Sequence, residues 1–270
     1  MPMKSKTAKN AATTKPAVKA KKVVRGKMRV ARMTLAEAMS ALEKAGSPQR
    51  RKICARHGMA EPMFGASYAT FSVLVKRIGI DHELACALWD TSNADARLLA
   101  LKIADPARMS AGDFGRWARG VRGRMMVKDF AQLAARGPHC AALASEWLGA
   151  KDDLPCIGWL LTGMLAMLDR DLPDAWFAAR LADAESSIHS APNAQREPMS
   201  MAVVMIGCRS AAFRKAATAT AKRIGKVDVD HGETSCETPD AAAFLAKAWT
   251  HSLSKGFESP AAHGHLPGWL

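Results

Sequence analysis

The sequence has 270 residues, of which 49% are hydrophobic and 24% charged, a balance that suits a packed globular protein and excludes a disordered one. Its formal net charge is +14, yet residues 1–32 alone hold eleven of the 39 Lys and Arg residues and no acidic residue. No apolar run approaches the roughly 20 residues that a membrane-spanning helix needs, and the N-terminus lacks the apolar core of a secretory signal. We therefore expect a cytoplasmic protein that makes no use of a membrane.

The charge divides the chain into a tail and a body. Residues 1–32 are rich in Lys, Ala and Thr and have no periodic apolar face, which predicts a basic disordered tail. Such a tail binds polyanions without specificity. In the body, residues 33–150 carry a net charge of +5 and residues 151–270 a net charge of −2. We expect a folded domain over residues 33–255 and a second tail over residues 256–270.

Helical periodicity begins at Thr34, where Thr34 and Glu37 have the spacing of a capping box. The next helices are predicted to start at Ser47, at Ser67 or Tyr68, and at Asp81, Asn93 and Ser110. Further helices are predicted over residues 125–135, 138–148, 153–168, 173–188, 193–206, 210–224 and 238–253. About a dozen helices with short loops and no alternating strand pattern predict an all-α fold. Because no single pair could bury its apolar face alone, the pairs are expected to stack as an α-α superhelix, a solenoid of antiparallel helix pairs.

One segment departs from the helical pattern. Residues 226–230 (KVDVD) have an extended pattern and are predicted to connect two helices. Metal-capable side chains follow within nine residues, at Asp228, Asp230, His231, Glu233 and Cys236. Their spacing matches no zinc pattern, so we expect no metal and no cofactor. The six cysteines are scattered without a C-x-x-C pair, which predicts reduced, mostly buried thiols.

The stretch from Met63 to Asp105 resembles the DNA alkylation repair enzyme family. It contains DHELACALWDT, DARLLALKIADP and, before them, a helix ending in KRIG. The resemblance continues more loosely to about Ala243, and the segment Asp228–Cys236 is similar to a bacterial subgroup of the family. It implies a HEAT-like repeat fold whose concave face holds DNA. It also implies hydrolysis of the N-glycosidic bond of N3- or N7-alkylpurines, in which a carboxylate and aromatic faces stabilise the developing sugar cation.

The resemblance places a candidate catalytic carboxylate at Asp129, in the segment MMVKD. Other positions depart from the family pattern: Met125 replaces a Trp, Cys156 lies where an Arg is expected, and residues 200–208 contain no Trp. These departures predict weak or lost excision and leave open whether the protein is an enzyme. The alternative from another class is a HEAT-like scaffold that binds protein partners.

Basic residues recur three to four positions apart over the segment 116–128. The predicted DNA-binding residues are Arg97, Arg116, Arg119, Arg122, Arg124, Lys128, Lys222, Arg223 and Lys226. Such a stripe contacts phosphates without reading bases; the alternative is a solvated face, or in the last three a complement to a helix C-terminus. Trp117, inside the run, is a candidate contact to a base or sugar. We expect a monomer that binds duplex DNA, damaged or distorted, in association with the nucleoid.

Overall fold

The computed structural model describes residues 32–266, so the N-terminal tail lies almost wholly outside the described residues. The described residues from Met33 onward belong to one compact unit. Its described part contains α-helices and two short 3-10 helices and no strand, so the predicted all-α class is confirmed. The helices are α1 (Leu35–Lys44), α2 (Pro48–Arg56), α3 (Tyr68–Ile78), α4 (His82–Asp90), α5 (Ala94–Ile103), η1 (Pro106–Arg108), α6 (Ala111–Ala118), α7 (Arg124–Ala135), α8 (Cys140–Leu148), α9 (Leu154–Leu168), α10 (Asp174–Ser187), α11 (Asn193–Gly207), α12 (Ala211–Ile224), α13 (Ala241–Ser254) and η2 (Pro260–His263).

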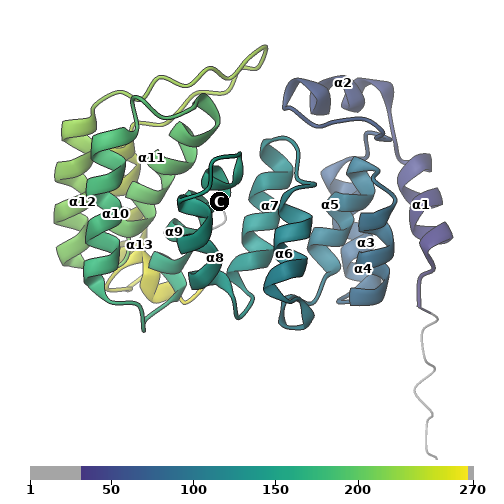
Figure 1. Ribbon diagram of the computed structural model, residues 1–270, viewed down its shortest axis with the longest axis horizontal. Helices are drawn as coiled ribbons and strands as arrows, with labels where there is room; N and C mark the ends of the chain where they lie inside the picture. Colours follow the sequence, from purple (N-terminus) through teal and green to yellow (C-terminus); the bar gives the residue numbers. More distant parts are fainter. Residues whose placement is uncertain (1–31, 267–270) are drawn as a thin grey trace, which may run out of the picture. The chain divides into compact units, whose positions relative to one another are not determined.

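The helices of this unit form two layers. In one layer α3, α5, α7, α9 and α11 pack in that order, each against the next. Helices from the other layer pair with them across short loops, α4 with α5, α8 with α9 and α12 with α11 (Figure 1). Short loops between neighbouring helices produce antiparallel pairs. The predicted stack of helix pairs is therefore present.

Local capping explains where many of the helices start. The Thr34 hydroxyl accepts from the N–H of Glu37, and the Glu37 carboxylate accepts from the N–H of Thr34, which is the predicted capping box. Ser110 and Asp113 form a second one at α6. Single side-chain caps hold the predicted starts of α2, α3, α4 and α5. Each cap satisfies N–H groups that the helix leaves without partners.

Helix α9 forms the centre of the core. Thirteen of its fifteen residues are buried, and it packs against α7, α8, α10 and α11. Two glycines make this crowding feasible. A Cβ on Gly158 would lie 2.9 Å from the backbone nitrogen of Leu148, and one on Gly163 would lie 2.7 Å from Sδ of Met205. No described helix, α9 included, combines the length and the apolar character needed to cross a membrane.

A buried carboxylate joins the start of α5 to the chain before α3. Asp95 is 1% exposed, and its two oxygens accept hydrogen bonds from the N–H groups of Phe64, Gly65 and Ala66 at 2.6–2.9 Å. A carboxylate with three such donors is well stabilised in the interior. The bend that leads into α3 is thereby fixed against the next repeat.

The segment after α13, predicted as a tail from residue 256, contains η2 within its described part. Pro260 and Ala261 of η2 are buried. Arg170 donates to the carbonyl oxygen of Ala261, and the Ala261 N–H donates to the carbonyl oxygen of Cys208. Residues 256–263 thus return to the stack and cover the ends of α9 and α11.

Candidate nucleic-acid interface

Asp129, the candidate catalytic carboxylate, points from α7 to a lysine on the neighbouring helix. Lys102 of α5 places Nζ at 2.7 Å from Oδ2 of Asp129. Only 15% of the Asp129 side chain and 26% of the Lys102 side chain are exposed. An ion pair that is screened from water in this way neutralises most of the carboxylate's field at a distance.

Other charged and polar side chains gather around this pair, and we call Tyr68, Lys102, Lys128, Asp129 and Glu197 the central cluster. They come from α3, α5, α7 and α11, all in one layer. Burial, reinforced by the Asp129 carboxylate, raises the pKa of the Tyr68 phenol. Partial burial lowers the pKa of the Lys128 ammonium group, which Asp129 opposes and the charge of Lys102 reinforces. The cluster therefore holds two ammonium groups and two carboxylates, and the second carboxylate, Glu197, forms an ion pair with Arg124.

Arg124 connects α7 to the far side of the stack. Its guanidinium forms an ion pair with Glu197 of α11 and a hydrogen bond with Nδ1 of His231. His231 belongs to the connector, residues 225–240, which lies between α12 and α13 without regular secondary structure (Figure 1). Nε2 of His231 lies 2.9 Å from Oγ1 of Thr238. The predicted extended segment 226–230 is part of this connector.

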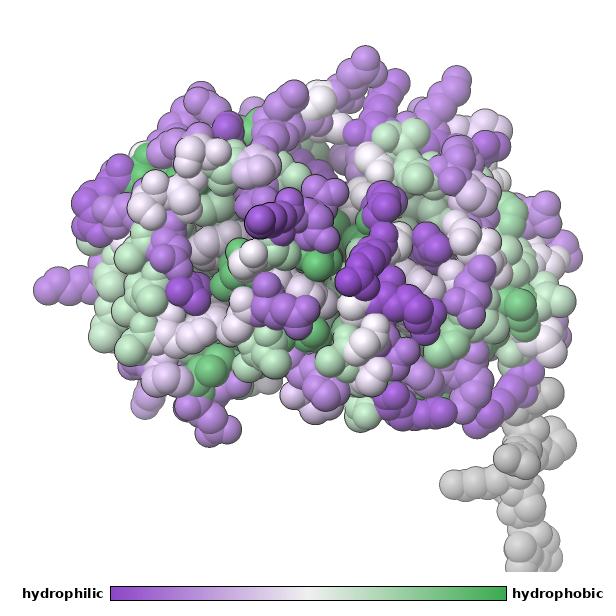
Figure 2. All heavy atoms as spheres, in the orientation of Figure 1, coloured by the Kyte–Doolittle hydropathy of each residue, from purple (hydrophilic) through white to green (hydrophobic). Residues whose placement is uncertain are grey.

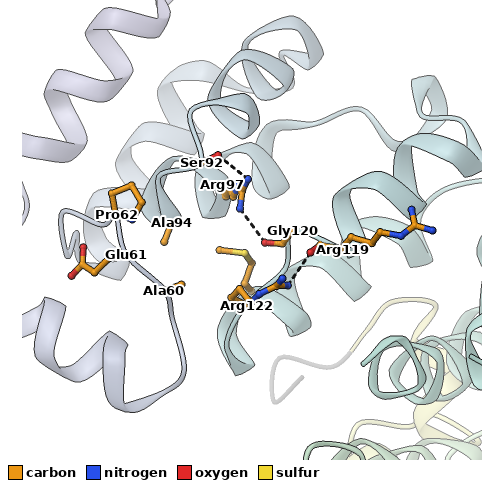
Figure 3. A pocket seen from close by; sticks show the side chains of 10 residues that line it. Ala60, Glu61, Pro62, Ser92, Ala94, Arg97, Arg119, Gly120 and Arg122 are labelled. Atoms are coloured by element: carbon orange, nitrogen blue, oxygen red, sulfur yellow. Dashed lines mark hydrogen bonds between the residues drawn. The ribbon is translucent and has the colours of Figure 1, made fainter. Parts of the chain in front are cut away.

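Arg97 and Arg122 line a pocket of about 370 Å³, which we call the arginine pocket (Figure 3). Arg97 donates to the carbonyl oxygens of Trp89 and Gly120, and its guanidinium lies 5.0 Å from the Trp89 ring. Arg122 donates through Nη1 to the carbonyl oxygens of Arg119 and Val121. Figure 3 shows the Arg119 side chain pointing away from the pocket, with only its carbonyl oxygen turned toward Arg122.

The remaining predicted DNA contacts lie elsewhere. Arg116 of α6 pairs with Asp90 and Asp113, within a region where Figure 2 shows hydrophilic side chains gathered over α6. On the last repeat, Lys222 is exposed. Arg223 pairs with Glu185 and Lys226 with Asp228. The predicted residues thus lie at four separate places: the arginine pocket, α6, the central cluster and the last repeat. The run over residues 116–128 is not one continuous stripe, and the role of these residues in DNA binding stays a prediction.

Three positions of the family pattern can now be placed. Met125 is partly buried on α7. Cys156 is buried in α9, where burial raises the pKa of its thiol to about 12. Met205 of α11, within the segment 200–208, is fully buried in the core. Neither Cys156 nor Met205 can reach a ligand on the surface, so these two departures are part of the core.

Trp117 was a candidate contact to a base or sugar, and its burial rules this out. It is 1% exposed and stacks on Trp89 with ring centroids 4.3 Å apart. The Trp89 ring also packs against the guanidinium group of Arg97, and both tryptophans belong to the core. Tyr68 is the exposed aromatic residue near Asp129, at 55% exposure.

Sequence reasoning missed Tyr68, Lys102 and Glu197 because each comes from a different helix. Their only sequence indication is a polar residue on an otherwise apolar helix, which is common on any solvated face. Between residues 32 and 266 no group of three His, Cys, Asp or Glu side chains is placed to hold a metal ion. This holds also for the acidic residues and Cys236 of the connector.

Comparisons with known proteins agree with the helical-repeat fold. A family model described as DNA alkylation repair enzyme matches residues 38–193. Two uncharacterized proteins, from Listeria innocua and Listeria monocytogenes, are 26% and 24% identical over 214 residues, covering 77% of this chain and 93% of each relative. A solved structure with 25% identity and a TM-score of 0.71 covers 87% of this chain and 99% of its own. That protein is described as one of a new family related to the HEAT-like repeat DNA glycosylases, with affinity for branched DNA structures.

Proposed function

Because the chain belongs to the DNA alkylation repair enzyme family, we propose that it binds DNA, including branched or otherwise distorted forms, with weak or no excision of alkylated purines. The observation that carries the lack of excision is the 2.7 Å ion pair between Lys102 and Asp129, and DNA binding rests on the family and the shared fold. The HEAT-like fold is shared with a protein described as having affinity for branched DNA structures.

The ion pair argues against excision on electrostatic grounds. Loss of an N-alkylpurine leaves a positive charge on the sugar, which an unmatched carboxylate would stabilise. With an ammonium group at hydrogen-bond distance, Asp129 presents a dipole, whose field falls off faster with distance than that of a charge. Lys128 adds a second cation beside it. Since both nearby carboxylates, Asp129 and Glu197, are already in ion pairs, neither is an unmatched negative charge for a developing cation.

The same region is suited to the DNA backbone. Residues 33–150 carry a net charge of +5, and Arg97, Arg122 and Lys128 have no carboxylate within ion-pair distance among residues 32–266. Cations of this kind gain free energy from phosphates through counterion release. A scaffold that binds protein partners on its solenoid surface would not gain free energy from counterion release.

Two measurements test the proposal. In single-turnover assays on methylated duplex DNA, wild type and Asp129→Asn should both release N7-methylguanine or N3-methyladenine at the background rate, with an active glycosylase as the positive control. In fluorescence anisotropy, wild type should bind a four-way junction at least as tightly as a duplex of the same sequence, and less tightly as salt increases. Base release by wild type that is lost in Asp129→Asn would contradict the proposed lack of excision. Failure to bind either DNA at low salt would contradict the proposed DNA binding and favour a protein scaffold.

A further inference from the structure

We infer that the arginine pocket receives one phosphate group of the bound DNA strand. The inference rests on the proposed function, and it specifies which residues bind the DNA at one point and which group of the DNA they bind. The pocket lies between the chain before α3, the start of α5 and the turn from α6 into α7. Figure 3 shows Arg97 and Arg122 facing it from two sides. Its volume of about 370 Å³ has ample room for a phosphate and the adjoining sugar.

Arg97 supplies a positive charge that cannot move away. Its Nε and Nη1 donate to the carbonyl oxygens of Trp89 and Gly120 at 3.2 Å, and Nη2 donates to the Ser92 hydroxyl at 3.1 Å. The Trp89 ring supports the guanidinium plane. These partners are all neutral, so they fix the group without compensating its charge. Burial, and then the charge of Arg122, lowers the pKa of Arg97, and the charge of Asp90, which is not within ion-pair distance, opposes this shift.

Arg122 supplies the donors. Only Nη1 is engaged within the described residues, with two carbonyl oxygens. Nε and Nη2 therefore remain for an acceptor. The two guanidinium groups repel each other across the pocket, and their hydrogen-bond partners are neutral. An anion between them would attract both groups and so offset this repulsion.

The pocket's one carboxylate is already occupied. Glu61 accepts from Nε and Nη2 of Arg51 through one oxygen and from the Met63 N–H through the other. These hydrogen bonds lower the pKa of Glu61, first of all the one from Arg51. The Glu61 carboxylate is thus paired with Arg51, and it forms no ion pair with Arg97 or Arg122.

The first turn of α7 adds to the positive potential at the same place. This helix begins at Gly123 without a side-chain cap and has no acidic residue in its first turn. Met126, in that turn, lines the pocket. The N-terminal end of a helix carries a partial positive charge that favours an anion. The arginines and the helix end thus act in the same direction.

Arg119 offers a matched control for Arg122. It lies three residues earlier, carries the same charge, and turns its guanidinium away from the pocket, where it donates to the carbonyl oxygen of Gly115. Arg122→Ala and Arg119→Ala change the net charge equally. A general loss of attraction for DNA affects both variants, whereas loss of a phosphate site affects Arg122→Ala alone.

The DNA test uses a four-way junction in anisotropy over a salt series. We expect Arg122→Ala to weaken binding about tenfold or more and to reduce the log-log salt slope by about one. Arg119→Ala removes a predicted DNA contact that lies outside the pocket, so it should weaken binding by a clearly smaller factor than Arg122→Ala does. A junction with single phosphates replaced by neutral methylphosphonates should show one position that matters for wild type and not for Arg122→Ala. Equal losses in the two variants, or no loss in Arg122→Ala, would overturn the inference.

A DNA-free arm separates this inference from the proposed function. In thermal unfolding, sodium pyrophosphate should raise the Tm of wild type and Arg119→Ala above that in sodium chloride of equal ionic strength, and should not do so for Arg122→Ala. If wild type shows this shift yet binds no DNA, the assignment of the phosphate to DNA is overturned and a free phosphate compound is the ligand. If wild type binds DNA but shows neither a shift nor a difference between the variants, the pocket is overturned and the proposed function stands.

Discussion

Asp95 shows how one side chain can fix the geometry of a repeat. Its carboxylate is buried and holds three consecutive N–H groups of residues 64–66. It also lies in the first turn of α5, where a negative charge is favoured by the helix dipole. The bend before α3, which contributes residues to the arginine pocket, depends on this one group.

We predict that Asp95→Asn lowers the free energy of unfolding by about 2–3 kcal/mol. An amide has one acceptor oxygen, so its NH₂ group would face at least one backbone N–H without a partner. Urea unfolding followed by circular dichroism measures the change. Asp105→Asn is the control, because Asp105 accepts one N–H at the exposed start of η1; it should cost less than about 0.5 kcal/mol. Equal losses would contradict the role given to the buried carboxylate.

The cysteines provide a second test at the residue scale. Cys140, Cys156 and Cys208 are buried, and burial raises the pKa of each thiol to about 12. Burial also raises the pKa of Cys54 and Cys86. Thiolate is the reactive form, and a raised pKa leaves little of it near neutral pH.

With a disulfide reagent at pH 8, native protein should therefore show one fast-reacting thiol, that of Cys236 in the connector, which is exposed. In guanidinium chloride, which unfolds the protein, all six thiols should react with the reagent. Cys236→Ser should lack the fast phase. A fast phase that persists in this variant would show that one of the helical thiols is open to solvent.

At the scale of elements, helix starts could be predicted from the sequence and the polar pairs between helices could not. Thr34 with Glu37 and Ser110 with Asp113 are separated by three residues, so their capping boxes are local interactions that the sequence displays directly. Asp129 pairs with a residue 27 positions away, and Arg124 with one 73 positions away. Such pairs depend on how repeats stack, and stacking follows from packing that no short pattern records.

Arg124 illustrates the difference most clearly. A run of arginines with few acidic neighbours in the sequence predicts open phosphate contacts. In the folded chain Glu197 approaches from α11 and His231 from the connector. The connector carries five carboxylates and one lysine over residues 226–240. The acidic half of the chain therefore supplies partners to the basic half.

The contact between α9 and α11 depends on Gly163. We predict that Gly163→Ala lowers the free energy of unfolding by about 1–3 kcal/mol, because the new methyl group would lie within 3.3 Å of both Met205 and Ala202. Gly112→Ala in the first turn of α6 is the control. Its methyl group would meet only the Ser110 hydroxyl oxygen, at 3.7 Å, so a gain of about 0.5 kcal/mol from helix propensity is expected. Destabilisation of similar size at both positions would exclude a packing cause.

For the whole molecule, the division of charge between tail and body can be tested directly. We predict that removing residues 1–32 weakens binding to duplex DNA but does not abolish it. The deleted segment carries eleven cations, while residues 33–150 keep a net charge of +5. The log-log salt slope should fall, since fewer counterions are released. Anisotropy at several salt concentrations provides both quantities, and a truncated protein that binds no duplex at low salt would contradict the prediction.

The return of η2 to the stack has a consequence for synthesis on the ribosome. Arg170 follows α9, yet the carbonyl oxygen that it binds belongs to Ala261, 91 residues later. Chains emerge from the ribosome N-terminus first, and early repeats can fold as they appear. Contacts with a long separation in sequence form late. We therefore expect the repeats up to α7 to fold on the nascent chain, while α9 and α11 reach their final packing only once residues 259–263 have left the exit tunnel.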